Sequence, residues 1–442
     1  MKHSTIFALS SGFGRTGISV YRLSGPDSGY ALINLSKRIL PKARYASRRI
    51  LYDEFGNKID DGLVIWFPKP HSFTGEDVVE LHLHGGIAVA SAITDALLKL
   101  NLEPADPGEF SRRAFLAGKF DLIQAEAISD LINAETTTQR LQALRQMDGA
   151  LTKIYNNWRN QLLQCQAYLE AEIDFSNEDL PNKINDQVML NLNNLVDEIS
   201  SHLNDNNCGE RLREGLSVTI VGAPNVGKSS LLNRIAKRDI AIVSSLAGTT
   251  RDVIEVHLNL SGYPVILADT AGLHESTETI EKEGVRKTYE YAKSADLKLI
   301  IFNAQTLEEP NTDSLALIDD RALIVVNKCD CQTKSLPNKI RDRSFLVVSA
   351  KTGIGIDSLI SELTNQVTLL LKKDDVPMIT RVRHRNALQK TEIAIRRALQ
   401  APFIELVAED IRLASRNLGK ITGKIEVEEM LDVIFNEFCI GK

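Results

Sequence analysis

The chain has 442 residues, more than a single hydrophobic core usually serves, so two to four domains are expected. Its 43% hydrophobic and 25% charged residues exclude a long disordered chain. Its net charge of −6 excludes a generally basic surface that coats nucleic acid, although a local basic patch is compatible with it. The sequence has no signal-peptide pattern, no apolar run of the roughly 20 residues that span a bilayer, and no cysteine framework, so we expect a soluble cytoplasmic protein.

Residues 1–118 are rich in glycine and in residues that favour β-strands. Three short apolar runs predict strands over Gly17–Leu23, Gly62–Phe67 and Val78–His84, and a helix is expected over Ala88–Leu100. This region is therefore predicted to be an α+β domain.

Two further regions have apolar residues at helical spacing. Residues 119–212 contain few glycines and carry one such stripe at Leu122, Ala125 and Leu131. Residues 374–442 repeat the pattern. Because a different kind of segment separates them, we expect the two regions to pack together as one discontinuous helical domain with an insertion.

The inserted region, residues 213–373, alternates strand-like and helix-like segments, which is typical of a doubly wound α/β domain. The expected strands are Leu216–Val221, Val265–Ala268, Leu297–Phe302, Ala322–Val326 and Phe345–Val348. The expected helices are Lys228–Ala236, Ile280–Lys293 and Ile356–Leu371.

A phosphate-loop motif follows the first of these strands and opens a helix. Gly222–Ser229 fits Gly-x-x-x-x-Gly-Lys-Ser/Thr, in which backbone N–H groups turn inward around phosphates at the positive end of a helix. Lys228 is expected to hold the β- and γ-phosphates, and the Ser229 hydroxyl to bind Mg²⁺.

Three further signals follow at predicted strand ends. Asp269–Gly272 offers a carboxylate for the Mg²⁺ shell and a glycine N–H for the γ-phosphate. In Asn327–Asp330 the Asp330 carboxylate can accept hydrogen bonds from the N1–H and the N2 amine of guanine. Adenine lacks both of these donors. Ser349–Lys351 can supply an N–H to guanine O6. The four signals together predict a GTP-binding and GTP-hydrolysing domain.

Hydrolysis needs a positioned water and a neutralised transition state. Leu273 stands where Ras-like GTPases carry a water-orienting glutamine, so that group must come from elsewhere, and acidic residues follow at Glu275, Glu278, Glu281 and Glu283. Neutralisation can come from Arg251, from a partner's arginine, or from a cation beside Asn225. The residues alone leave this choice open.

The sequence closely resembles the tRNA-modification GTPase family MnmE, also called TrmE, over essentially its whole length. The shared motifs inside the insertion are the phosphate loop, Ala247–Asp252 and Asp269–Leu273. Motifs specific to this family lie outside it, at Ser72–Asp77, His84–Gly86, Pro107–Phe115, Asp121–Ala127 and Cys439–Lys442. The segments Gly12–Gly17 and Asn303–Asp320 depart from the family pattern without touching a matched site residue.

The resemblance implies a potassium-activated GTPase with a Ras-like P-loop G domain. By this resemblance K⁺ is held by Asn225, Ser244, Leu246 and Thr249, Mg²⁺ by Ser229 and Thr250, and the attacking water by Glu281. The full set of residues expected at GTP is Asn225, Val226, Gly227, Lys228, Ser229, Ser230, Ser244, Ser245, Leu246, Ala247, Gly248, Thr249, Thr250, Asp269, Thr270, Ala271, Gly272, Asn327, Lys328, Asp330, Ser349 and Ala350.

The resemblance also implies an N-terminal tetrahydrofolate-binding fold that forms a homodimer. Residues expected at 5-formyl- or 5,10-methylene-tetrahydrofolate are Arg22, Glu80, Lys119 and Lys442, with the Cys439 thiol nearby. Family members act with the FAD protein MnmG to add an aminomethyl or carboxymethylaminomethyl group to C5 of the wobble uridine of certain tRNAs. The alternative is a regulatory GTPase that acts as a nucleotide-controlled binding module in ribosome assembly, which would have no use for a folate domain.

Overall fold

A computed structural model describes residues 4–12, 14–174, 183–238, 240–242, 254–269, 291–332, 335–371, 377–425, 428–436 and 438–441. The chain divides into two compact units. The first comprises Met1–Ser129, Gln146–Glu170 and Ala408–Lys442, and the second comprises Asp130–Arg145 and Ala171–Val407. Within the described ranges no helix is both long and apolar enough to cross a membrane.

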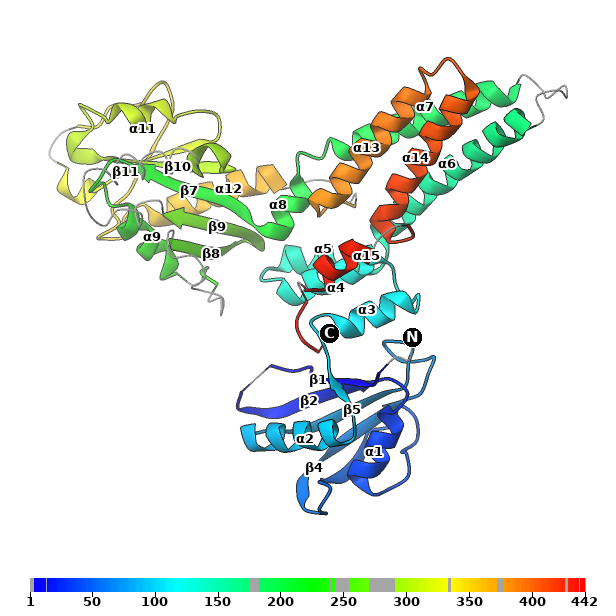
Figure 1. The fold of residues 1–442 in the computed structure, drawn as a ribbon. Helices are drawn as coiled ribbons and strands as arrows, with labels where there is room; N and C mark the ends of the chain where they lie inside the picture. Colours follow the sequence, from blue (N-terminus) through cyan, green and yellow to red (C-terminus); the bar gives the residue numbers. More distant parts are fainter. Residues whose placement is uncertain are drawn as a thin grey trace, which may run out of the picture. The chain divides into compact units, whose positions relative to one another are not determined.

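The first unit contains a six-stranded sheet in the order β3-β4-β5-β2-β1-β6 (Figure 1). Its strands are antiparallel except for the parallel pair β1–β6. Their bounds are β1 Ile6–Leu9, β2 Thr16–Ser24, β3 Ser47–Tyr52, β4 Lys58–Phe67, β5 Val78–Gly85 and β6 Glu103–Pro104. Sequence analysis predicted β2, β4 and β5 and missed the other three.

Alternation along β5 separates a core face from a polar face. Val79, Leu81 and Leu83 are buried, whereas the intervening Glu80 and His82 are only partly buried. The buried residues pack with the helices α1 (Ser28–Ser36) and α2 (Ile87–Lys99), and the latter matches the predicted helix to within one residue at each end.

Helices complete the first unit. They are α3 (Glu109–Leu116), most of α4 (Leu122–Asn133) and α6 (Ala150–Asp174), and, from the last region of the chain, most of α14 (Ile404–Thr422) and all of α15 (Glu428–Asn436). Leu122 of α4 shares a buried cluster with Leu431 and Phe435 of α15, so residues some 300 positions apart pack together. This packing confirms the prediction that the two helical regions join.

The second unit contains the other six-stranded sheet, in the order β12-β11-β10-β7-β9-β8, with β7 between β9 and β10 (Figure 1). Five strands are parallel and β8 runs antiparallel to β9. The bounds are β7 Leu216–Gly222, β8 Ile254–Leu260, β9 Tyr263–Asp269, β10 Leu297–Asn303, β11 Ala322–Asn327 and β12 Leu346–Val347. All five predicted strands are present, and β8 is an addition.

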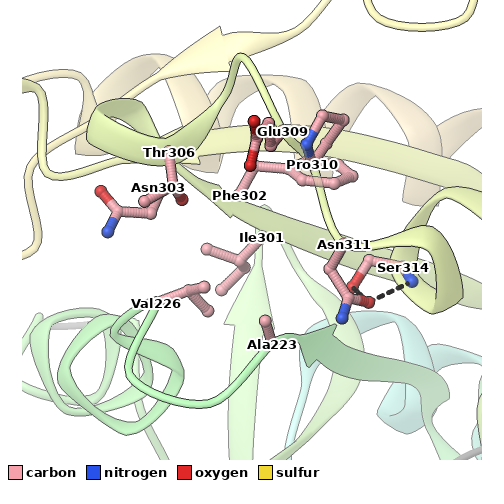
Figure 2. Close-up of a pocket in the computed structure, with 10 residues that line it drawn as sticks. All are labelled: Ala223, Val226, Ile301, Phe302, Asn303, Thr306, Glu309, Pro310, Asn311 and Ser314. Carbon is pink, nitrogen blue, oxygen red and sulfur yellow. Dashed lines mark hydrogen bonds between the residues drawn. The ribbon is translucent and has the colours of Figure 1, made fainter.

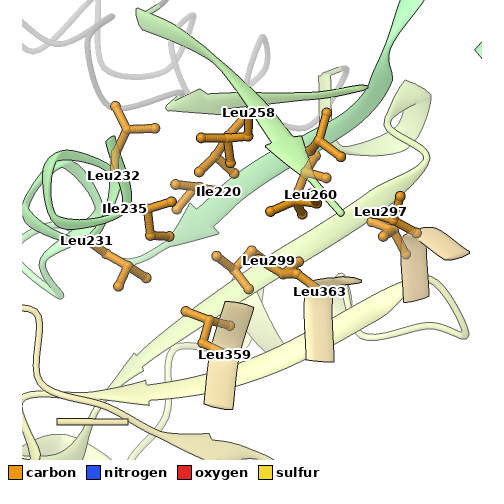
Figure 3. Packing of buried hydrophobic residues seen from close by; sticks show 14 of the residues in the cluster. Ile220, Leu231, Leu232, Ile235, Leu258, Leu260, Leu297, Leu299, Leu359 and Leu363 are labelled. Atoms are coloured by element: carbon orange, nitrogen blue, oxygen red, sulfur yellow. The ribbon is translucent and has the colours of Figure 1, made fainter. Parts of the chain in front are cut away.

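Helices cover this sheet and bury its central strands. They include α9 (Lys228–Ala236), α11 (Thr312–Ala316) and α12 (Ile356–Leu371), of which α9 and α12 have the predicted bounds. Figure 3 shows Leu299 of β10 against Leu359 and Leu363 of α12, with Ile220 of β7 near the leucines of α9. The predicted helix Ile280–Lys293 lies largely outside the described residues.

Four further helices lie wholly or partly in the second unit. They are α5 (Thr137–Met147), α7 (Lys183–Leu203), α8 (Cys208–Glu214) and α13 (Val382–Ala398). α7 precedes the inserted domain in the chain and α13 follows it, yet Ser200 of α7 donates a hydrogen bond of 2.7 Å to Glu392 of α13. The insertion therefore separates two helices that pack together.

Candidate functional site

The phosphate loop connects the end of β7 to the start of α9. Gly227 has φ of +97° and Asn225 has φ of +61°, so the chain passes twice through left-handed conformations. A Cβ added to Gly227 would lie 2.5 Å from Nδ2 of Asn327, so this position requires glycine. The loop ends at the N-terminus of α9, where backbone N–H groups without helical partners favour an anion.

Lys228 is the cation of this loop. Its Nζ donates hydrogen bonds to the backbone oxygens of Gly222 at 2.8 Å and Ala223 at 3.0 Å. Burial lowers the pKa of this ammonium, and the charge of Asp269 acts in the opposite direction. The side chain is therefore folded over the loop, where a phosphate oxygen can replace a carbonyl oxygen as its partner.

Ser229 and Asp269 meet as the sequence motifs predict. The register between β7 and β9 pairs Ile220 with Asp269 and so brings the end of β9 beside the phosphate loop. The Ser229 hydroxyl donates a 2.6 Å hydrogen bond to the fully buried Asp269 carboxylate. A hydroxyl and a carboxylate are oxygen ligands of the kind that Mg²⁺ prefers. These two residues can thus contribute to a magnesium site, Ser229 directly and Asp269 through water.

Asn327 ties the base-reading loop to the phosphate loop. This side chain is 1% exposed. Its Nδ2 donates to the Val226 oxygen at 2.8 Å, and its Oδ1 accepts from the Ala350 N–H at 3.0 Å. Next to it, Lys328 Nζ donates to the Asn225 oxygen at 2.6 Å. Three of the predicted motifs are therefore joined by hydrogen bonds at one edge of the sheet.

Asp330 is held by a buried hydroxyl from the last motif. Ser349 is fully buried, and its Oγ donates a 2.5 Å hydrogen bond to Oδ1 of Asp330. This hydrogen bond is the main reason why the pKa of Asp330 lies below its ordinary value. The carboxylate is thus kept ionised and ready to accept hydrogen bonds from a base.

Arg234 of α9 holds the backbone of the Ser349–Lys351 motif. Its Nε donates to the Ala350 oxygen at 2.9 Å, and a second guanidinium nitrogen donates to the Lys351 oxygen. Sequence analysis did not single out this arginine, because only its position on α9 beside the Ser349–Lys351 loop gives it this role.

A pocket of about 250 Å³ lies between the phosphate loop and the segment that runs from β10 to α11. Figure 2 shows Ala223 and Val226 of the loop facing Ile301 of β10, with Asn311 and Ser314 across the opening. The Asn311 side chain accepts a hydrogen bond from Ser314 N at 2.9 Å and so caps α11. Its lining comes from two stretches of sequence, 223–226 in the phosphate loop and 301–314, and no motif in the second stretch marked the pocket.

The remaining residues predicted at the nucleotide are Ser230 and three groups that lie outside the described residues. Ser230 lies on α9, exposed beside Ser229. The segments Ser244–Thr250 and Thr270–Gly272, together with Glu281, lie outside the described residues. Their expected roles at K⁺, Mg²⁺ and the attacking water remain predictions.

Two of the residues expected at folate, Arg22 and Glu80, lie on the first unit's sheet. Arg22 of β2 and Glu80 of β5 face each other in register and form an ion pair of 2.9 Å, each side chain being less than 20% exposed. The guanidinium also lies 5.3 Å from the ring centre of Phe73 and 5.9 Å from that of Phe110. Both phenylalanines belong to family-specific motifs, but sequence analysis gave neither a site role.

Of the other two expected folate residues, the structure describes only Lys119, on a neighbouring segment of the same unit. Lys119 Nζ donates to the Pro70 oxygen, and a Cβ on Gly75 would lie 3.0 Å from Cε of Lys119, so this lysine packs on the loop that carries Phe73. Lys442 lies outside the described residues. Its neighbour Gly441 accepts a 2.9 Å hydrogen bond from Ser10, next to β1, and Cys439 is exposed.

The nucleotide motifs meet at the carboxyl ends of parallel strands, with a phosphate loop on one side and an Asn-Lys-x-Asp loop on the other. This arrangement defines the class of P-loop guanine-nucleotide-binding proteins. Comparisons with known proteins specify the family. Residues 5–119 match the family model described as GTP-binding protein TrmE N-terminus, and residues 122–439 match that of the MnmE helical domain.

Relatives match over the whole length of the chain. The tRNA modification GTPase MnmE of Paramagnetospirillum magneticum is 54% identical over 438 residues, which is 99% of each chain. That of Rhodospirillum rubrum is 49% identical over 457 residues, which is 100% of each. Among solved structures, Aquifex aeolicus Era bound to GDP and AlF4⁻ is 26% identical and covers 40% of this chain and 66% of its own, with a TM-score of 0.28. The chain belongs to the MnmE/TrmE family.

Proposed function

We propose that this chain is a GTPase that takes part in tRNA modification. The observation that carries the proposal is the 2.6 Å contact between Ser229 and the buried Asp269, which brings a metal-binding pair to the phosphate loop of a chain aligned end to end with tRNA modification GTPases. Lys228 binds the β- and γ-phosphates, and Asp330 selects guanine through N1–H and the N2 amine.

Catalysis is assigned to a cation and a carboxylate. Asn225, Ser244, Leu246 and Thr249 hold K⁺, which neutralises charge in the transition state, and Thr250 joins Ser229 on Mg²⁺. Glu281 orients the attacking water, since Leu273 has no group to do so. The position of Asn225 on the phosphate loop supports the potassium assignment.

The first unit binds the one-carbon donor, 5,10-methylene-tetrahydrofolate, with 5-formyl-tetrahydrofolate as an analogue. Arg22 and Lys119 suit the anionic glutamate tail, Glu80 suits the N–H edge of the pterin, and Phe73 and Phe110 offer aromatic faces. Lys442 and Cys439 complete the site. The ion pair of Arg22 with Glu80 supports this grouping.

The assembly follows the same reasoning. The protein acts in the cytoplasm as a homodimer joined through residues 1–118, with residues 213–373 as the G domain and 119–212 plus 374–442 as the helical domain. With the FAD protein MnmG it adds an aminomethyl or carboxymethylaminomethyl group to C5 of uridine 34. Exposed Ile18 and Leu63 on the first sheet, at 64% and 46%, support an apolar contact with a second copy.

Two measurements test the proposal. Mass spectrometry of tRNA nucleosides from a strain lacking the gene is expected to show loss of the modified wobble uridine and its return on complementation. GTP turnover by the purified chain is expected to be much faster in KCl than in NaCl. Unchanged wobble nucleosides would exclude the tRNA function in favour of a regulatory GTPase, and equal rates in both salts would exclude the potassium mechanism alone.

A further inference from the structure

A short segment, Asp130–Arg145, is grouped with the nucleotide-binding domain although it is remote from that domain in sequence. Ser129 before it and Gln146 after it both belong to the first unit. The segment contains the end of α4 and most of α5. It is therefore continuous at both ends with the unit that carries the folate residues, while its own contacts are with the unit that carries the nucleotide site.

At one end the segment binds the two connections of the inserted domain. The Asp130 carboxylate, 14% exposed, accepts hydrogen bonds from Arg213 at 2.9 Å and from Arg381 at 2.8 Å. Arg213 stands three residues before β7, where the chain enters the inserted domain, and Arg381 stands after α12, where it leaves. One carboxylate thus holds both connections.

Further along, the segment binds the β8–β9 hairpin. Glu135 pairs with Nδ1 of His257 on β8 at 2.8 Å. Thr138 donates from both its backbone N–H and its hydroxyl to the oxygen of Gly262 in the turn of the hairpin. β8 starts immediately after residues 243–253, which include the proposed K⁺ and Mg²⁺ ligands, and β9 ends at Asp269.

Two glutamines link these contacts. Gln139 donates to the backbone oxygen of Arg213 at 3.0 Å, and Gln142 donates to that of Gly209 on α8 at 3.3 Å. The segment therefore contacts both the strand that follows the proposed metal ligands and the helix through which the chain enters the domain. A displacement of either would be transmitted to the segment, since hydrogen bonds fix it to both.

We propose that Asp130–Arg145 is the coupling segment through which nucleotide state controls tRNA modification, with Asp130 and Glu135 as positioning residues. This inference rests on the proposed function. Neither residue contacts the phosphate loop in the described structure, so both act through Arg213, Arg381 and His257. Their loss should uncouple GTP hydrolysis from modification and leave hydrolysis itself intact.

The test compares Asp130→Asn with Asp130→Glu and with Asp186→Asn, a matched change at an exposed acid of α7. In the full chain, Asp130→Asn should keep GTP turnover within about twofold of the wild-type rate, while the modified uridine in complemented cells falls at least about fivefold, as expected for loss of an allosteric coupling. Asp130→Glu should restore part of the modification, and Asp186→Asn should behave as wild type.

Hydrogen exchange provides a readout that a merely structural role would not change. In the wild-type protein, GDP is expected to slow exchange at α5 amides relative to the nucleotide-free protein, and Asp130→Asn should abolish that difference. If Asp130→Asn fails to fold, Glu135→Gln takes its place in both measurements. Turnover and modification falling in proportion, or both staying at wild-type level, would overturn the inference. Failure of the wild-type chain to restore modification would instead defeat the proposed function.

Discussion

The two six-stranded sheets of this molecule present their polar residues in different ways. In β10 of the mostly parallel sheet, Leu299, Ile300 and Ile301 are successive and all fully buried, because helices cover both faces. In β5 of the antiparallel sheet, buried Leu81 stands next to partly exposed His82. A sheet covered on both sides can offer ligands only the ends of its strands, whereas a sheet with a polar face can place an ion pair in mid-strand.

The positions of the site residues follow this difference. Asp269 and Asn327 are the last residues of β9 and β11. Arg22 and Glu80, in contrast, lie within β2 and β5. Each site is therefore built from its own residues, so in the absence of nucleotide a mutation at one should leave ligand binding at the other unchanged, and the first and third predictions below test this.

Lys228→Ala should have the largest effect. Loss of the cation at the β- and γ-phosphates is expected to lower GTP turnover by about 10²- to 10³-fold, since it removes a charge that stabilises the transition state. Release of inorganic phosphate at saturating GTP measures this rate. The exposed Lys237 beyond the end of the same helix provides the control, Lys237→Ala, which should keep wild-type turnover. Altered affinity for 5-formyl-tetrahydrofolate in nucleotide-free Lys228→Ala would show that the two sites share residues.

Core substitutions should distinguish the two sheets next. Leu299→Ala and Ile300→Ala, at adjacent positions of β10, should each destabilise their sheet by about 2–5 kcal/mol. In β5, Leu81→Ala should cost the same, whereas His82→Ala should cost less than about 1 kcal/mol, because only one face of that strand is in the core. Native-state hydrogen exchange of each sheet measures these local stabilities. Equal costs at Leu81 and His82 would show that the polar face of β5 is as important for packing as its core face.

Arg22→Ala is expected to weaken binding of 5-formyl-tetrahydrofolate by about 10- to 100-fold, the usual range for loss of charge-assisted hydrogen bonds. Calorimetric titration of the full chain measures it. Arg48→Ala, which removes another arginine paired with a carboxylate on the same sheet, should bind folate normally. GTP turnover should stay unchanged in both variants, and a loss of turnover in Arg22→Ala would argue against separate sites.

The smallest effect concerns pH and Ser349→Ala. In the wild-type protein the Ser349 hydroxyl lowers the pKa of Asp330, so guanine recognition persists as the pH falls below the ordinary aspartate value and is lost only near the lowered pKa. Without the hydroxyl the pKa rises, and GDP affinity should be lost at a higher pH, by less than about one pH unit. Fluorescent GDP titrated between about pH 2.5 and 5.5, a range that extends below the ordinary aspartate pKa, measures the shift. A midpoint that does not move would mean that Ser349 does not tune Asp330.

Much of the nucleotide-binding domain could be predicted because its information is local. The phosphate loop and the strand before it are adjacent in sequence, and α9 and α12 have the predicted bounds. β8 was not predicted, although Glu255, His257 and Asn259 alternate with apolar residues, which is a strand signal present in the sequence.

Contacts between distant segments could not be predicted. Asn327 reaches Val226 and Ala350 only because β11 lies in the same sheet as β7, with its end beside the phosphate loop. The stacking of Arg22 on Phe73 depends on how a loop returns over the sheet. Sequence periodicity states which face of an element is apolar, but it does not specify the register or the partner.

The hydrogen bond between Ser200 and Glu392 joins residues 192 positions apart. During synthesis, therefore, α7 leaves the ribosome long before α13 exists. By the time α13 is made, every strand of the inserted sheet is already complete. The inserted domain can mature first, and its folding then brings the two helices within reach of each other. If the inserted domain folds slowly or incorrectly, the apolar face of α7 stays uncovered in the growing chain. An uncovered apolar face promotes aggregation and binding by chaperones.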